Sequence, residues 1–175
     1  AEGSAEDIIV VLPYTYSRII GASLYGPLGF NGDQFRITSE YSDTTGSLAW
    51  LYGEHRKGVM YNHFIYHTGY RYNDRVLGHS LDSNSKYVSL NATLTKANGW
   101  EYSLKYQNIL INSENDTKNH LSNFRERINS LSLNLKVQTK IGEIRLNSRI
   151  MDNEINTKFE NKVNIGINTS WAITF

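Results

Sequence analysis

Apolar and polar residues alternate along the last part of the chain. From Val163 to Phe175 every second residue is apolar, with a gap at Thr169, and the residues between them are small or polar. A period of two predicts a β-strand with one face toward an apolar medium. A long alternating strand that ends on an aromatic residue is typical of the closing strand of an outer-membrane β-barrel. We therefore expect this strand to carry the assembly signal, in Ile167, Trp171, Ile173 and Phe175.

The same alternation predicts paired strands upstream. It extends over residues 86–95, 100–107, 131–137 and 144–150, with tight turns at Asn98-Gly99 and near Gly142. Polar residues fill the connections 112–123 and 152–161, which reads as two longer loops. Outer-membrane barrels have short periplasmic turns and longer extracellular loops. We therefore expect both long loops to lie outside the cell.

The first half of the chain is less regular. Strands are predicted over residues 19–25 and 34–43, and the Tyr- and His-rich stretch 60–72 alternates from Asn62. The stretches 44–58 and 75–86 read as loops. The count is roughly eight strands, which a small closed barrel permits. The prediction is all-β: an antiparallel transmembrane β-barrel, with residues 1–175 as one barrel segment.

Composition narrows the classes of protein. Mean hydropathy is -0.47, and the longest apolar run, Ile8 to Leu12, is far short of the roughly 20 residues of a membrane-spanning helix. The 12 Tyr and 3 Trp suit aromatic girdles, although soluble sugar-binding sandwiches are also Tyr-rich. A net charge of +1, with basic and acidic residues interspersed, argues against a nucleic-acid partner. The absence of Cys excludes disulfides and thiol nucleophiles within this chain.

Charged residues occupy one side of the predicted strands in the second half. Because a charge facing lipid is costly, these residues are expected to face the barrel lumen. Their mixed signs favour a filled, salt-bridged interior over an open pore. The alternative is the solvated face of a soluble sheet. The residues are Glu101, Lys105, Lys136, Glu143, Arg145 and Arg149.

Three ordered stretches resemble one known family. Residues 35–44 read Phe-Arg-Ile-Thr-Ser-Glu-Tyr-Ser-Asp-Thr, residues 61–72 contain Tyr-Asn-His and Gly-Tyr-Arg-Tyr, and residues 75–82 contain Gly-His-Ser. Together they are similar to the capsule assembly protein Wzi family. The resemblance implies an integral outer-membrane barrel, lectin-like and not an enzyme, that holds capsular polysaccharide on the cell surface. Family members are much longer, so the chain corresponds to their C-terminal part.

The resemblance also sets the expected partners. Besides capsular polysaccharide, these are outer-membrane lipid and the barrel assembly machinery. A strand edge facing lipid would leave its amide groups unpaired. A missing N-terminal barrel half, closure of the chain on itself or a second chain is therefore required. Three other functions stay open: an outer-membrane porin or diffusion channel, a membrane-embedded hydrolase and a soluble sugar-binding sandwich.

Candidate polysaccharide-binding residues gather in one stretch. Aromatic rings stack on sugars, and guanidinium groups pair with the carboxylates of acidic capsules. For the tyrosines, a membrane-interface girdle is the alternative reading. The predicted binding residues are Tyr66, Tyr70, Arg71, Tyr72, Arg75 and His79.

No catalytic or metal-binding constellation is predicted. His79, Ser80 and Asp82 lie close in sequence, but adjacent residues of an extended chain point to opposite faces. His63 and His67 have helical zinc spacing, and on a strand they would lie about 13 Å apart. We therefore expect no catalytic residue, no metal and no cofactor.

Overall fold

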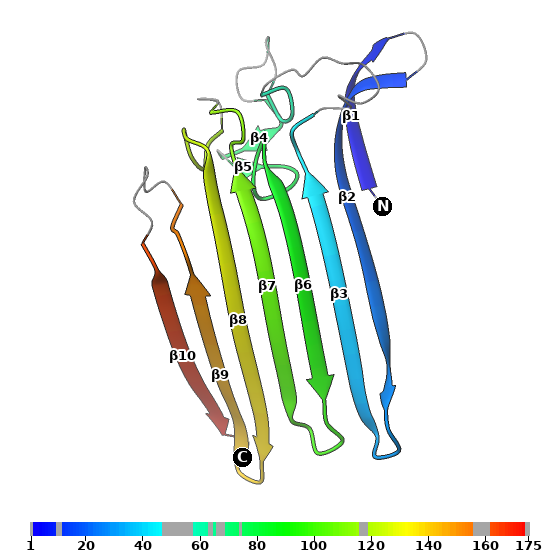
Figure 1. Ribbon diagram of the computed structural model, residues 1–175, viewed down its shortest axis with the longest axis vertical. Helices are drawn as coiled ribbons and strands as arrows, with labels where there is room; N and C mark the ends of the chain where they lie inside the picture. The colour runs from blue at the N-terminus through cyan, green and yellow to red at the C-terminus, as the bar shows by residue number, and fades with distance from the viewer. Residues whose placement is uncertain are drawn as a thin grey trace.

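A single antiparallel sheet dominates the molecule (Figure 1). The computed structural model describes residues 2–9, 12–46, 58–62, 65, 69–73, 75–115, 119–155 and 162–173. Eight strands lie in the order β1-β2-β3-β6-β7-β8-β9-β10, and two short strands, β4 and β5, form a separate hairpin. Their bounds are β1 Glu2–Ile9, β2 Leu12–Leu28, β3 Asp33–Asp43, β4 Arg71–Tyr72, β5 Arg75–Val76, β6 Lys86–Thr95, β7 Glu101–Ile111, β8 Glu126–Thr139, β9 Gly142–Met151 and β10 Asn164–Ile173.

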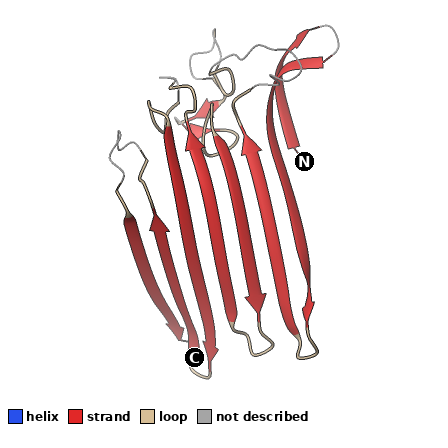
Figure 2. Ribbon diagram, in the orientation of Figure 1, coloured by secondary structure: helices blue, strands red, loops and turns tan. Residues whose placement is uncertain are grey.

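The all-β prediction is confirmed. Within the described part of the chain every element is a strand, and every strand of the large sheet pairs antiparallel with its neighbours (Figure 2). β1 and β10 lie at opposite edges, and in the described residues each pairs with one strand. The sheet is therefore open, which is the arrangement of part of a β-barrel.

The connections differ in length between the two ends of the sheet. At the lower end of Figure 1, residues 29–32, 96–100 and 140–141 join consecutive strands. At the upper end the longer connections 44–85, 112–125 and 152–163 join the strands. The predicted alternation of short and long connections is confirmed and holds from β2 to β10, whereas β1 ends only three positions before β2 begins.

Strand register sorts the side chains onto two faces. On one, the apolar face, Leu90, Tyr106, Leu131 and Ile150 form one row across four neighbouring strands. Large side chains of this face are well exposed, with Leu131 at 46%. Among the described residues no second layer covers them (Figure 1). An exposed apolar face of this size is unfavourable in water, so it requires contact with lipid or with another protein surface.

The opposite, polar face carries the charged residues predicted to share a side. Glu101, Lys136 and Arg145 form one row, and Lys105 and Arg149 flank Ser132 in another. Lys136 donates to the Glu143 carboxylate at 2.9 Å, and Arg145 pairs with the same carboxylate. The predicted clustering of mixed charges on one face is therefore correct.

One predicted strand is absent from the sheet. Among the described residues of the stretch 60–72 the structure forms only β4, because Tyr61 (φ +63°) and Gly69 (φ +58°) take left-handed conformations that end an extended strand. The eighth strand is β1 instead, which the sequence reading missed. β2 also begins well before the expected residues 19–25. Tyr66, His63, His67 and Phe175 lie outside the described residues.

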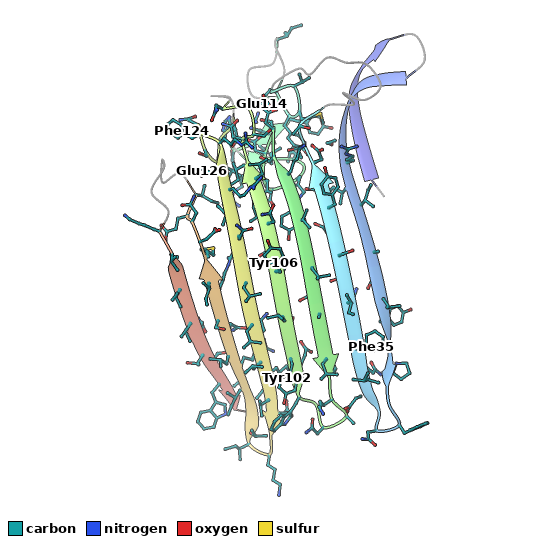
Figure 3. All side chains as sticks on the ribbon, in the orientation of Figure 1. Phe35, Tyr102, Tyr106, Glu114, Phe124 and Glu126 are labelled. Atoms are coloured by element: carbon teal, nitrogen blue, oxygen red, sulfur yellow. The ribbon has the colours of Figure 1, made fainter. Side chains whose placement is uncertain are left out.

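Buried apolar residues gather at the upper end of the polar face. Ile109, Ile111 and Ile128 are buried there and pack against Leu81 and Leu121 of the connections. Figure 3 places Glu114, Phe124 and Glu126 at this end, Tyr106 midway, and Phe35 and Tyr102 toward the short turns. The long connections therefore fold over the upper part of the polar face. Searched over the described residues, no helix has the length and hydropathy to cross a membrane.

Candidate functional site

The connection between β3 and β6 forms a compact cap, here called the rim segment (described residues 58–62, 65, 69–73 and 75–85). Asp82 is its central acceptor. Its carboxylate accepts hydrogen bonds from Arg71 Nη2 at 2.6 Å, from Ser83 N at 2.7 Å and from His120 N at 3.0 Å. Both side chains of the Arg71–Asp82 ion pair are at most 4% exposed. The pair holds the rim segment together, and the hydrogen bond from His120 N ties Asp82 to the connection between β7 and β8.

A second set of polar contacts anchors the rim segment to the strand ends. Thr44, just after β3, exchanges hydrogen bonds with Ser85 through both backbone and side chain. Asn84 accepts from Gly58 N at 3.1 Å, and its carbonyl accepts from Ser113 N at 2.7 Å. Nearly every residue in this set is fully buried. Buried polar groups require such partners, so the network fixes the cap in one conformation.

Tyr61 is wedged between two glycines of the rim segment. A Cβ at Gly69 would lie 2.1 Å from the Tyr61 carbonyl oxygen, and one at Gly78 would lie 2.4 Å from the Tyr61 ring. The same carbonyl accepts from Tyr70 N, and the phenol oxygen accepts from His79 N at 3.0 Å. Only glycine permits this approach, so the Gly-Tyr and Gly-His elements serve packing here.

The β4–β5 hairpin divides the predicted binding residues between two faces. Tyr72 pairs with Arg75, and Leu77 N donates to Tyr70 O at 2.9 Å, which continues the ladder. Tyr70 and Tyr72 are 64% and 70% exposed, and Arg75 and Leu77 are exposed beside them. We call these four residues the hairpin face. The structure thus brings three predicted residues together, and Leu77 is an addition that the sequence reading missed.

Arg71 points the other way. Its guanidinium donates to Tyr61 O at 2.9 Å and to Asn62 Oδ1 at 2.7 Å, besides its ion pair with Asp82. With a side chain 3% exposed, it organises the cap beneath the hairpin face. Asp82 carries no periodic signal in the sequence, so this pairing could not be found there.

His79 also lies against the sheet. Its Nδ1 accepts from Leu81 N at 3.3 Å, so in the neutral ring Nε2 carries the proton and donates to Ser42 Oγ at 2.9 Å. Burial lowers the pKa of His79 from its ordinary 6.5, an effect that the Glu40 carboxylate opposes. A base that activates Ser42 would have to accept the hydroxyl proton, whereas this ring donates. The hydrogen bond between His79 and Ser42 holds the rim segment against β3.

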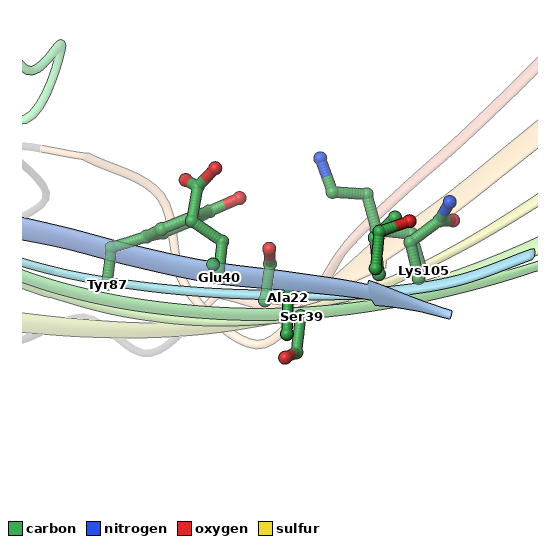
Figure 4. A pocket seen from close by; sticks show the side chains of 10 residues that line it. Ala22, Ser39, Glu40, Tyr87 and Lys105 are labelled. Atoms are coloured by element: carbon green, nitrogen blue, oxygen red, sulfur yellow. The ribbon is translucent and has the colours of Figure 1, made fainter. Parts of the chain in front are cut away.

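Below the rim segment the polar face is hollowed (Figure 4). Glu40, Tyr87 and Lys105 rise from the same side of the sheet around this trough. Hydroxyl and amide groups of Ser23, Ser89 and Asn91 complete it. Such a lining hydrogen-bonds water or sugar hydroxyls equally well.

The described residues contain no group of three or more His, Asp or Glu side chains that could hold a metal ion. Three of the four predicted assembly residues lie in β10: Ile167 and Trp171 are exposed on the apolar face, and Ile173 pairs with Gly142, while Phe175 lies outside the described residues. Neither the assembly role nor the polysaccharide-binding role is tested by this geometry, and both stay predictions.

Comparison with known proteins gives two matches. The sequence model of the capsule assembly protein Wzi family matches residues 1–163. A solved structure of Wzi, described as an outer membrane protein involved in group 1 capsule assembly in Escherichia coli and as a carbohydrate-binding β-barrel, is similar over 97% of this chain, with a TM-score of 0.65 and 19% identity. The match spans 34% of that chain. At this identity the likeness establishes the barrel fold. No curated protein matches in a sequence search.

Proposed function

Because the chain belongs to the capsule assembly protein Wzi family, we propose that it forms part of a bacterial outer-membrane barrel that holds capsular polysaccharide at the cell surface. The observation that carries the proposal is the pairing of an uncovered apolar sheet face with an exposed aromatic hairpin face at one end. The first feature suits lipid, and the second suits a sugar polymer. The chain spans about a third of the solved relative, so the activity belongs to the full-length protein.

The apolar face supports the membrane location. Through the middle of β6 to β10 its mainly apolar side chains alternate with the polar ones of the opposite face, as in barrels with lipid outside and a polar lumen, with Ser148 and Thr169 as exceptions. Trp171, Tyr102 and Phe35 lie toward the short-turn end of this face, where an interface girdle would sit. We place the short turns in the periplasm and the rim segment outside.

The hairpin face supports polysaccharide binding. Tyr70 and Tyr72 offer ring faces for stacking on sugars, and Arg75 beside them can pair with a uronate carboxylate. Because the buried network fixes the cap, these side chains are displayed without ordering a flexible loop at each contact. A repeating polymer meets many copies on a cell, which multiplies weak contacts.

The decisive experiment measures the ratio of cell-bound to free capsular polysaccharide. Loss of the protein should release polymer without stopping its synthesis. Tyr70→Ala, Tyr72→Ala and Arg75→Ala combined should release most of the polymer. Tyr25→Ala, an exposed tyrosine near the short turns, is the matched control and should retain it. Normal retention by the folded triple variant would remove the hairpin face from the proposal.

Orientation is tested by single cysteines, since this chain has none. A cysteine at the exposed Asn123 should react with an impermeant reagent on intact cells, whereas one at the exposed Asn98 should not. Equal labelling would reject the orientation.

A diffusion channel is the second candidate, favoured by the polar trough around Glu40 and Lys105. The packing of Leu81 and Leu121 onto Ile111 at the upper end of this face opposes an open channel. Planar-bilayer recording separates the two: steady conductance with normal capsule retention would favour the channel.

A further inference from the structure

A row of cations closes the upper edge of the apolar face. Register places Arg18, Asp43, Lys86, Leu110 and Arg127 in line across β2, β3, β6, β7 and β8. Because paired residues share a face, all five lie on the side of the apolar residues. The next row toward the short turns begins Ile20, Tyr41, Val88 and continues with Asn108 and Asn129. The apolar surface therefore starts immediately below Arg18 and Lys86, and one row lower on β7 and β8.

The row is positively charged and preorganised. The Asp43 carboxylate is 4% exposed and lies 3.0 Å from Arg18 Nη2 and 4.0 Å from Lys86 Nζ, while Tyr41 donates to it at 2.9 Å. Arg18 and Lys86 each keep more than a third of their side chains exposed. Arg127 is exposed and forms no ion pair with another described residue. Two cations thus share one carboxylate, and the third, Arg127, adds a further positive charge to the row.

Neighbouring acids leave a net positive charge. Asp152, which accepts from Asn129 N and Nδ2 at 2.7 and 2.6 Å beside the following row, keeps its negative charge because amide donors are neutral, so three cations stand against two carboxylates. Glu126 is buried on the opposite face. At the short-turn end of the sheet, by contrast, Lys96 pairs with Asp33 at 3.5 Å. The exposed Lys140 is a further cation at that end.

We propose that this cationic row binds the phosphate groups of an anionic glycolipid in the surrounding outer leaflet. A lipid whose tails cover the apolar face carries its headgroup to the height of the row. Strands are about 4.8 Å apart, so Lys86 and Arg127, two strands apart, stand about 10 Å from each other. Guanidinium and ammonium groups at that spacing can engage separate phosphates of one headgroup. The inference rests on the membrane location proposed above.

The test uses the full-length protein in nonionic detergent and native mass spectrometry. The probes are bis-phosphorylated lipid A and the same lipid without phosphates. Lys86→Gln with Arg127→Gln should bind the phosphorylated lipid about 30-fold more weakly than the parent. Lys96→Gln with Lys140→Gln, which removes two cations at the other end, should bind like the parent. The dephosphorylated lipid should bind all three proteins alike.

Several outcomes would overturn the proposal. Equal affinity of the cation-depleted variant and the parent for phosphorylated lipid is one. Displacement of the lipid by equimolar inorganic phosphate is another, because it would indicate a free-anion site. Arg127→Gln alone provides a variant without any lost ion pair, so a folding defect cannot excuse a negative result. If neither lipid binds any of the proteins, the membrane location itself fails; if both lipids bind equally, only the cationic row fails.

Discussion

The rim segment and the apolar face of the sheet differ in which side chains they bury. In the rim segment the most buried side chains are polar, with Ser83 and Asn84 at 0% exposed. On the apolar face of the sheet large apolar side chains are exposed, with Ile167 at 71%. One region is held by directional hydrogen bonds, and the other is prepared for a medium that rewards exposed hydrocarbon. The hydrogen-bonded rim segment and the apolar surface therefore lie within the length of one strand of each other.

Removing the central acceptor of the rim segment should have the largest effect. Asp82→Ala leaves the Arg71 guanidinium buried and unpaired, which costs about 3–5 kcal/mol. Limited proteolysis should cut the rim segment rapidly while the heat-modifiable mobility of the barrel persists. Lys96→Ala, in the more exposed pair with Asp33, should change stability by less than about 1 kcal/mol. Equal protease resistance of both variants would contradict a network centred on Asp82.

A charge on the apolar face should come next. Leu133→Arg places a cation at mid-strand on the apolar side and should lower the free energy of unfolding in vesicles by about 2–4 kcal/mol. Asn134→Arg, one residue away on the polar face between Ser103 and Asn147, should have little effect. Similar losses in denaturant titrations of both would remove the distinction between the faces.

The tyrosine wedge predicts a smaller and more local loss. Gly78→Ala drives a methyl group into the Tyr61 ring and should destabilise the rim segment by about 1–3 kcal/mol. Hydrogen exchange of residues 69–85 should accelerate while that of β7 and β8 stays unchanged. Gly166→Ala, which meets no atom within 4 Å, is the control. Slow exchange in the Gly78 variant would show that the cap tolerates a displaced Tyr61.

Acidification should have the smallest effect. Because burial lowers the pKa of folded His79, the unfolded rim segment binds a proton first as pH falls below about 6.5. Stability of the rim segment should therefore decline below that pH, until the folded ring also protonates. Hydrogen exchange measured across this range should detect it, and His79→Gln should remove the dependence. If the pH dependence of stability persists in the His79→Gln variant, another titratable group causes it.

The alternation of apolar and polar residues predicted the positions of the regular strands. The expected strand 86–95 coincides with β6, and the expected strand 131–137 lies inside β8. The stretch 60–72 misled because side chains alternate there while the backbone turns at Tyr61 and Gly69. The split between buried Arg71 and the exposed hairpin face depends on how β4 and β5 sit on the cap. That placement follows from contacts between distant residues, for which the sequence has no periodic signal.

The unequal connections also set an order of strand pairing. Joining β3 to β6 closes the connection 44–85, roughly ten times longer than the turn 29–32, at an added entropic cost of about 2 kcal/mol. The β2–β3 hairpin and the β6–β7 hairpin therefore form early, and the pairing of β3 with β6 forms late. Until then β3 and β6 each present a bare edge, so this seam is where the growing sheet is most open to mispairing.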